Sequence, residues 1–442
     1  MLGQLKYIYK KFPTRIISPF IRVLGLTPAY SRRMWNKISS IENDEELNFN
    51  VEVLLKGLVD DINKVSYYKK DSFENFKNEA NLKSLRNLPF LDTEIVRNNI
   101  DGFTNRAVSG YTTSTGGSGR NPLKIYLSND SYFEDRKFVF YAWSKLGYKR
   151  NDLKLTLRGV NLGTKLIEYN PMNNELNVNV FLMNNSTIVK IILEINKWKP
   201  TFGQGYPSAW FIFTSLLREH NLELKQQLDG IYFASESINE EKRTFVESFF
   251  EVDVRGTYGL SERSCFAFEK KDDKGVYKVM LEYGLIEIIK KNGNQAAVGE
   301  TGEIVSTGFI NRAMPLIRYR TGDFAEVVKI ENNIVVEVRN IIGRWGKDFI
   351  LDKEGNKIYT TSINIHSSAQ FDFRYIQIKQ DEPGIIHMYF VPFSGLNEKS
   401  LVTVKKEFQR KLSNIKIESH VIEFEKLYKT ERGKIPFLIK ST

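Results

Sequence analysis

The stretch Met314-Pro-Leu-Ile-Arg-Tyr-Arg-Thr-Gly-Asp323 is followed further along the chain by Gly343-Arg344. The Thr-Gly pair predicts a tight turn that fixes the carboxylate of Asp323, and an arginine comes a short distance later. A carboxylate accepts hydrogen bonds from hydroxyls and a guanidinium donates them. The pair therefore suits the two hydroxyls of a ribose, although each piece alone is also an ordinary loop sequence.

A second informative segment reads Thr112-Thr-Ser-Thr-Gly-Gly-Ser-Gly-Arg-Asn-Pro-Leu123 and runs into an alternating stretch that ends at Leu127. Glycines let backbone N–H groups turn toward an anion, and Ser and Thr hydroxyls add further donors. The segment lacks the Gly-Lys-Ser/Thr ending of a Walker loop. It predicts either a loop that binds phosphates or a flexible surface hairpin.

A β-α-β unit is predicted between Asp229 and Glu262. Its expected parts are a buried strand over 231–234, a helix over 238–250 opened by a capping box of Ser237 and Glu240, and a strand over 252–254. Such strands are parallel, and ligands bind beyond their carboxyl ends. Glu236 and the turn from Tyr258 to Glu262 fall at that edge. The ring of Tyr258 can stack on a purine there, or it can be a core side chain, and Glu262 can hold magnesium.

The C-terminal stretch Tyr428-Lys-Thr-Glu-Arg-Gly-Lys-Ile-Pro436 places a lysine after a glycine-centred turn. Lys434 can therefore present a mobile point charge. Alone this signal is weak, because the chain has 64 lysines and arginines.

Together and in this order, the segments resemble the acyl-adenylate-forming superfamily, and in particular its phenylacetate–CoA ligase branch and the CapK-like enzymes of capsule biosynthesis. The resemblance runs from about Tyr111 to Lys434. It implies a ligase that activates a carboxylic acid with ATP to acyl-AMP and pyrophosphate, and then passes the acyl group to a thiol such as CoA. Magnesium is the implied metal, and capsule or surface polysaccharide synthesis is the implied setting.

Three alternatives stay open. The acyl acceptor can be a sugar hydroxyl or an amine, as in capsule-type relatives. The chain can be a nucleotide-binding relative without activity, or a peripheral membrane protein whose basic N-terminus is its main function.

The resemblance also implies roles for single residues. Thr113, Ser114, Thr115, Gly116, Gly117 and Ser118 would wrap the ATP phosphates; Tyr258 would contact adenine; Asp323 and Arg344 would hold the ribose; Glu236 would lie at the ATP-binding edge; Glu262 would be catalytic and bind magnesium; Lys434 would bridge the acyl carboxylate and the α-phosphate; Tyr206 and Trp210 would lie beside the acyl pocket; and Lys347 would be the hinge.

Two segments depart from the family pattern. Gly119 and Arg120 stand where the family loop has Thr and Gly, so the register after Ser118 differs. In the hinge segment, Trp345 and Gly346 add one residue before Lys347 and the acid that follows it.

Length and patterning predict an α/β fold. A chain of 442 residues exceeds what one core serves, so we expect two or three domains. A large adenylation domain over 1–346 should bind ATP and the acid, with parallel sheets, helices and a small antiparallel sheet or barrel. A small mobile C-terminal α+β domain should follow over 347–442 and rotate about Lys347 between the two half-reactions.

Local patterns predict the remaining elements. They are mostly helices over 1–110; a helix capped by Ser131 and Glu134 that ends near Lys145; an aromatic helix from Tyr206 to about Leu217; short strands over 285–289, 303–306, 324–329 and 333–338; and, nearer the C-terminus, strands over 375–379, 386–391 and 415–424 with a helix around 401–412.

Composition narrows the partners. The net charge of +11 favours an anionic partner such as ATP, CoA or an anionic membrane, and no nucleic-acid motif is present, so we expect no nucleic acid. Residues 1–33 are basic and amphipathic, which predicts either peripheral membrane contact or a helix packed on the large domain. With no membrane span or signal peptide, we expect a cytoplasmic location, with or without contact at the inner membrane face.

Cysteine and histidine give little chemistry. Cys265 is the single cysteine, so an intrachain disulfide is excluded. The four histidines are scattered along the sequence, so we expect no metal site built from His or Cys.

Overall fold

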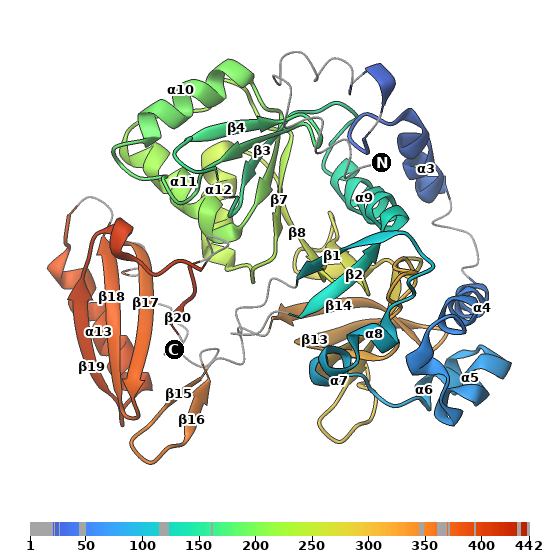
Figure 1. Ribbon diagram of the computed structural model, residues 1–442. Coiled ribbons are helices and arrows are strands. Elements are labelled where there is room, and N and C mark those ends of the chain that lie inside the picture. The colour runs from blue at the N-terminus through green and yellow to red at the C-terminus, as the bar shows by residue number, and fades with distance from the viewer. Residues whose placement is uncertain are drawn as a thin grey trace.

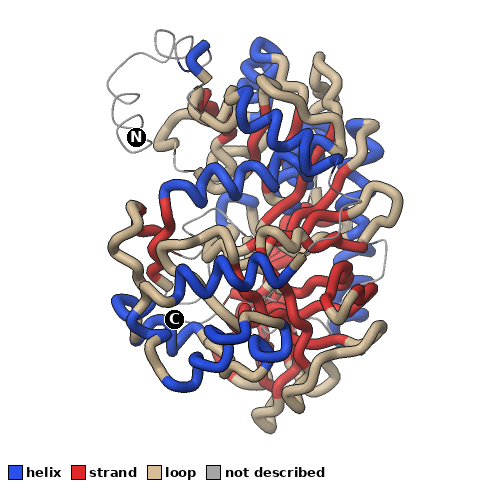
Figure 2. The backbone as a smooth tube through the Cα atoms, turned by 90° about the vertical axis from the view of Figure 1, so that its right-hand side faces the viewer, coloured by secondary structure: helices blue, strands red, loops and turns tan. Residues whose placement is uncertain are grey.

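The fold is given by a computed structural model, which describes residues 21, 23–25, 27–43, 50–114, 123–160, 162–343, 349–359, 369, 372–392, 395–430 and 435–439. Its centre is a twelve-stranded sheet in the order β11-β12-β13-β14-β10-β9-β8-β7-β6-β3-β5-β4. A four-stranded sheet near the C-terminus lies beside it (Figure 1). Figure 2 shows the strands running through the middle of the molecule with helices to either side.

One half of the large sheet is parallel, as the predicted β-α-β unit requires. It comprises β3 (Lys154–Leu157), β5 (Glu175–Val178), β6 (Phe202–Gly205), β7 (Gly230–Ala234) and β8 (Val254–Gly259), with β4 (Ile167–Asn170) antiparallel at the edge. A parallel strand covered on both faces is apolar throughout. In β7, Ile231 and Phe233 enter one hydrophobic cluster and Tyr232 enters another.

Helices cover both faces of this half, which explains the two clusters. One face is covered by α10 (Ile188–Trp198), α11 (Pro207–Glu219) and α12 (Glu240–Phe250), and the other by α3 (Arg32–Asn43) and α9 (Asn129–Ser144). The predicted aromatic helix is confirmed as α11.

Two predicted helix starts are wrong by a few residues. The side chain of Ser128, not Ser131, caps α9 by accepting a hydrogen bond from the N–H of Ser131. Asn239, not Ser237, caps α12. Asn and Ser cap about equally well. The sequence therefore offered several equivalent caps within one turn, and local spacing could not choose among them.

The antiparallel strands, which were predicted as a small sheet or barrel, continue the parallel half in one sheet. It contains β9 (Phe266–Glu269), β10 (Val276–Val279), β11 (Gly284–Ile289), β12 (Thr301–Gly308), β13 (Tyr319–Glu331) and β14 (Ile334–Ile342). The link is the antiparallel pair β8·β9, in which Thr257 lies opposite Phe268. Sequence patterns located β11 to β14 but neither β9 nor β10. They also could not show which strands are neighbours, because pairing depends on contacts between distant segments.

The helical prediction for the first part of the chain is confirmed where the structure describes it. Besides α3, it contains α4 (Val51–Ile62), α5 (Glu74–Glu79), α6 (Leu82–Arg86), α7 (Thr93–Asn98) and α8 (Ile100–Phe103), with 3-10 turns at Ser66–Tyr68 and Asp71–Phe73. These helices share a core with the hairpin of β1 (Gly110–Ser114) and β2 (Lys124–Ser128) and with the segment before β13. The hydroxyl of Tyr68 donates to the carbonyl of Pro315 at 2.8 Å.

The C-terminal part is an α+β unit, as expected. A hairpin of β15 (Phe349–Leu351) and β16 (Lys357–Tyr359) precedes a sheet in the order β19-β18-β17-β20, formed by β17 (Phe373–Glu382), β18 (Ile385–Pro392), β19 (Lys416–Val421) and β20 (Leu438–Ile439), with α13 (Glu398–Lys411) and a 3-10 turn at Phe424–Lys426. Met388 and Phe390 of β18 pack with Val404 and Phe408 of α13. The domain boundary stays a prediction, since Lys347 lies outside the described residues.

A buried polar cluster joins β3 and β5. Lys154 and Glu175 lie opposite each other in the parallel register, and Arg158 lies 3.0 Å from the Glu175 carboxylate. Burial opposes the charge of Glu175, but Arg158 and Lys154 outweigh it and lower its pKa to about 2. Burial lowers the pKa of Lys154 to about 7, against the opposing effect of Glu175.

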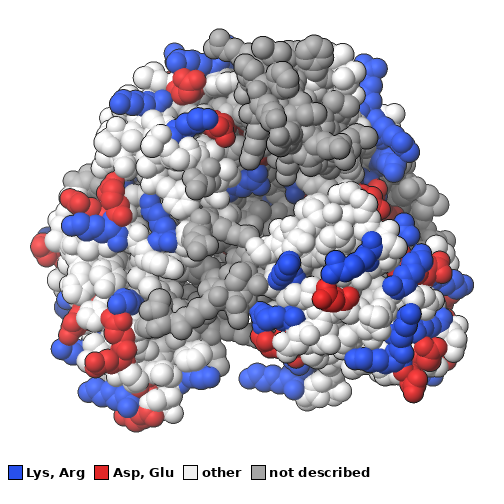
Figure 3. Space-filling model, viewed as in Figure 1, with Lys and Arg blue, Asp and Glu red and all other residues white. Residues whose placement is uncertain are grey.

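The surface carries charges of both signs. Basic and acidic side chains are interspersed over the outer parts of the face seen in Figure 3. Across the described residues, no helix combines the length and apolarity needed to cross a bilayer.

Candidate active site

The candidate site lies where the parallel strands end. Glu236 follows the carboxyl end of β7, Tyr258 is at the end of β8, and Glu262 is in the turn after β8. Parallel pairing of β7 with β8 sets these ends side by side. The three residues therefore reach the edge where the sequence placed them.

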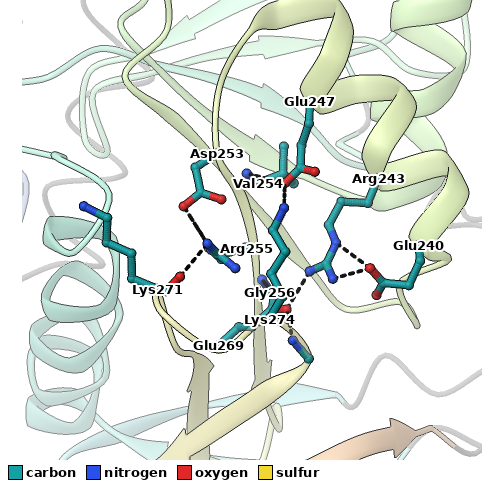
Figure 4. A network of polar contacts seen from close by, with 11 residues as sticks. Glu240, Arg243, Glu247, Asp253, Val254, Arg255, Gly256, Glu269, Lys271 and Lys274 are labelled. Atoms are coloured by element: carbon teal, nitrogen blue, oxygen red, sulfur yellow. Dashed lines mark hydrogen bonds and ion pairs between the residues drawn. The ribbon is translucent and has the colours of Figure 1, made fainter.

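A network of buried charges holds β8 in position beneath this edge (Figure 4). Arg243 of α12 lies 2.6 Å from Glu269 of β9, and both side chains are almost fully buried. The other carboxylate oxygen of Glu269 accepts the N–H of Gly256 in β8 at 2.7 Å. The helix and both strands are thus fastened together just before Tyr258.

The tyrosine and the predicted ribose-binding carboxylate are in direct contact. The hydroxyl of Tyr258 donates to Oδ2 of Asp323 at 2.9 Å. Asp323 lies in β13 and is 7% exposed. Its backbone N–H donates to the hydroxyl of Thr321 at 3.0 Å. Burial, followed by the Asp323 charge, raises the pKa of Tyr258 well above its usual value. Tyr258 therefore stays protonated and can orient the carboxylate.

Gly343, the first residue of the Gly-Arg motif, lies close to the carboxylate of Asp323. A Cβ placed on this glycine would lie 3.8 Å from Oδ1 of Asp323. Arg344 follows directly in the chain, although it lies outside the described residues. The close approach of Gly343 accords with the predicted pairing of Asp323 and Arg344.

Glu262 is 3% exposed and accepts a hydrogen bond from the hydroxyl of Tyr319 at 3.1 Å. Tyr319 is the residue before the Arg-Thr-Gly-Asp turn, and its hydroxyl also lies 3.1 Å from the hydroxyl of Thr93. The motif thus orients both carboxylates of the site. A single carboxylate next to bound phosphates fits Mg²⁺, which keeps several waters and takes few protein ligands.

The buried thiol of Cys265 lies close enough to both carboxylates for their charges to affect its pKa. Burial is the main reason that the pKa of Cys265 is raised, and the charges of Asp323 and Glu262 raise it further. Both carboxylates of the site therefore act on this thiol.

Arg263 was not identified from the sequence. It has φ of +57° and is 8% exposed. Its guanidinium donates to the hydroxyl of Tyr111 in β1 at 3.0 Å and to the hydroxyl of Ser131 in α9 at 2.6 Å. Arg263 therefore couples the turn that carries Glu262 to the hairpin. The adjacency of a charged residue to Glu262 was the only available signal.

The predicted phosphate loop connects the two strands of that hairpin. Thr113 and Ser114 are the last residues of β1, where Ser114 pairs with Lys124 of β2. Thr115, Gly116, Gly117 and Ser118 lie outside the described residues, as do Lys347 and Lys434. Their roles stay predictions.

Tyr206 is the N-cap residue of α11 and Trp210 lies in its first turn, and both belong to one buried hydrophobic cluster. The carboxylate of Glu236 accepts the N–H of Ser208 at 3.1 Å and so caps this helix. Trp210 is fully buried in the hydrophobic core. Its predicted place beside an acyl pocket stays a prediction.

The C-terminal unit meets the large sheet unit next to Glu236. Ile435, the residue after Lys434, belongs to the same cluster as Tyr206, and its carbonyl accepts the hydroxyl of Tyr375. The ammonium of Lys242 in α12 lies 5.0 Å from the Tyr375 ring, and burial lowers the pKa of Lys242.

An ion pair of Arg374 with Glu219 at 2.6 Å spans the same contact. The two side chains are 3% and 18% exposed, so the pair is largely shielded from water. Arg374 comes from β17 and Glu219 from the end of α11. Charge pairing therefore fixes this arrangement of the two parts of the chain.

Comparisons with known proteins agree with this geometry. No protein-family model matches the chain. CapK of Staphylococcus aureus is 23% identical over 468 residues, covering 99% of this chain and 99% of CapK. Phenylacetate-coenzyme A ligase of Pseudomonas putida is 27% identical over 176 residues, covering 38% of this chain and 36% of that enzyme.

Solved structures show the same fold. The postadenylation state of 2-hydroxyisobutyryl-CoA ligase, bound to an acyl-AMP, matches with a TM-score of 0.65 at 13% identity over 88% of this chain and 89% of that one. Its thioesterification state, bound to an acyl-AMP and CoA, matches with a TM-score of 0.54 at 13% identity and the same coverage. Motifs, full-length relative and fold agree that the chain belongs to the acyl-adenylate-forming superfamily.

Proposed function

We propose that this protein is an AMP-forming acid–thiol ligase. A carboxylate oxygen of the acid attacks the α-phosphorus of ATP, and pyrophosphate leaves. A thiol, with CoA as the first candidate, then attacks the acyl carbon, and AMP leaves. The observation that carries the proposal is the Tyr258–Asp323 contact at the carboxyl edge of the sheet, with Glu262 oriented beside it by the same motif.

The residues of this site would bind and orient rather than react. Asp323 would accept hydrogen bonds from the ribose hydroxyls through one carboxylate oxygen, while its other oxygen, Oδ2, accepts the hydrogen bond from Tyr258. Thr113 and Ser114, at the base of the loop, would contribute donors to the phosphates. Magnesium held by Glu262 would cancel charge on those phosphates. Positioning and charge cancellation are the main demands of phosphoryl transfer between two anions.

Lys434 would supply the remaining positive charge in the first half-reaction. Its neighbour Ile435 is anchored in the cluster under α11, a short distance from the Glu236 edge. The greater likeness to the postadenylation state of the ligase than to its thioesterification state supports assigning this arrangement to acyl-AMP formation. Rotation about Lys347 would then break the Arg374–Glu219 pair and open the face for the thiol.

ATP–pyrophosphate exchange with a panel of aliphatic, aromatic and hydroxylated carboxylic acids tests the first step. We expect exchange that depends on one acid class and is lost in Asp323→Ala. ATP binding without exchange for any acid would instead favour an inactive nucleotide-binding relative.

The second step is tested by adding acceptors to the protein loaded with acyl-AMP. Release of AMP on addition of CoA supports the thiol ligase. Release only with an amine or a sugar hydroxyl would move the proposal to acyl transfer onto such an acceptor, the alternative that the resemblance to capsule-type enzymes leaves open. Vesicle co-sedimentation at low and physiological salt tests contact of residues 1–33 with an anionic membrane.

A further inference from the structure

Two histidines that are distant in sequence meet on the C-terminal sheet. β18 and β19 pair in parallel, with His387 opposite Glu418 and Tyr389 opposite His420. Side chains alternate along a strand. These four side chains therefore share one face, opposite to Met388 and Phe390, which pack on α13. Figure 1 shows β18 and β19 as neighbours at the outer side of this unit.

The three potential ligand atoms converge. Nδ1 of His387 lies 3.2 Å from Nε2 of His420 and 3.5 Å from Oε2 of Glu418. All three ligand atoms lie within 4.8 Å of one another. In a tetrahedral zinc site with bonds of about 2.0–2.1 Å, two ligand atoms are about 3.4 Å apart. The two measured separations match this spacing.

The surroundings hold the rings in orientations suited to binding. The Tyr389 ring stacks on His420 with centroids 5.2 Å apart. Nε2 of His387, on the far side of its ring, lies 3.9 Å from a carboxylate oxygen of Asp381. Metal-bound histidines commonly direct their other nitrogen to a carboxylate. Lys416 binds Oε1 of Glu418 at 2.7 Å, so it is Oε2 that faces the histidines.

We propose that His387, Glu418 and His420 form a surface site for a divalent transition-metal ion, with Zn²⁺ as the best fit. Two imidazoles and one carboxylate suit zinc better than magnesium or calcium, which prefer oxygen ligands only. Three protein ligands leave the fourth position for water or for an anionic group of a bound molecule. The ion ties the edge strand β19 to β18.

The site is distinct from the nucleotide site. Val391, which enters the cluster shared with the large sheet unit, is on β18 four residues beyond His387, or about 13 Å along the strand. His387 and Glu418 are 25% and 36% exposed, so an ion has direct access from solvent.

The test uses the full-length, tag-free protein, stripped with a chelator and kept in excess Mg²⁺ to occupy oxygen-ligand sites. Titration with ZnCl₂ by calorimetry should give one strong site per chain. Co²⁺ should give the visible absorption of a tetrahedral site, which Zn²⁺ abolishes. His387→Ala and His420→Ala should each weaken Zn²⁺ binding by at least about 100-fold, the upper end of what loss of an outer partner costs.

Matched variants separate this site from general binding to histidines. His220→Ala, which removes a half-buried histidine of the large unit, should leave Zn²⁺ affinity unchanged, and Asp381→Asn should weaken it by about tenfold. The Co²⁺ spectrum of the unaltered protein decides the matter even if a variant fails to fold. Absence of micromolar Zn²⁺ binding, or equal binding by His387→Ala and the unaltered protein, would overturn the proposal and leave a hydrogen-bonded histidine pair.

Discussion

The hydroxyl of Tyr258 offers the sharpest test of the nucleotide site. Tyr258→Phe keeps the ring, and so any stacking on adenine, but removes the 2.9 Å hydrogen bond to Asp323. A hydrogen bond to a charged group contributes about 1.5–3 kcal/mol. The bond is already present without ATP, so removing it should lower ATP affinity only through poorer placement of the carboxylate. We expect the lower end of that range, or about a tenfold weaker affinity for ATP.

The chain supplies a matched control. Tyr283 is buried, and its hydroxyl donates to Asp135 at 3.0 Å rather than to either carboxylate of the candidate site. Tyr283→Phe therefore removes a similar bond and should lower the melting temperature without changing ATP affinity. Calorimetric titration with ATP and thermal unfolding of both variants make the comparison. If both variants lose stability alike and both bind ATP as the unaltered protein does, the Tyr258–Asp323 pair is structural and the reasoning fails.

Three further changes test other parts of the account. Lys434→Ala should slow acyl-AMP formation by about 10²-fold or more and spare transfer from supplied acyl-AMP; equal damage to both steps would contradict its assignment. Glu219→Gln removes the negative charge that faces the buried Arg374 and so destabilises the observed contact between the C-terminal unit and α11. We therefore expect a lower ratio of the adenylation rate to the transfer rate. An unchanged ratio would mean that the contact has no part in the reaction. Because the folded-state pKa of Glu175 is about 2, below its usual 4.5, its contribution is present above about pH 4.5 and is lost as pH falls toward 2. Glu175→Gln should therefore flatten the fall in melting temperature over that window, and a parallel fall would show that other groups control acid unfolding.

Short-range chemistry made much of the fold predictable. The strand at 231–234 was recognisable because both faces of β7 are apolar, and α11 because its aromatic run continues from a proline. The continuity of the large sheet was not predictable. It depends on the antiparallel pairing of β8 with β9, seen where Thr257 lies opposite Phe268, and β8 is otherwise part of the parallel half.

The candidate site was predicted unevenly for the same reason. Asp323, Tyr258 and Glu262 were found because their motifs are local, and the structure adds how Tyr258 and Tyr319 orient the carboxylates. Arg263 was missed because its partners come from separate segments. The meeting of His387 with its partner histidine depends on strand register, which no spacing in the sequence reveals.

The seam at β8 has a mechanical consequence. This strand pairs in parallel with β7 on one side and antiparallel with β9 on the other, so one continuous set of backbone hydrogen bonds joins the side nearer α11 to the side that carries Asp323. A rigid plate of this kind cannot bend between its halves without breaking those hydrogen bonds. We therefore expect any movement between the two parts of the chain to occur in the segments that connect them rather than within the large sheet. Amide protons along β8 should consequently exchange with solvent more slowly than those of the β15–β16 hairpin, which lies outside the plate.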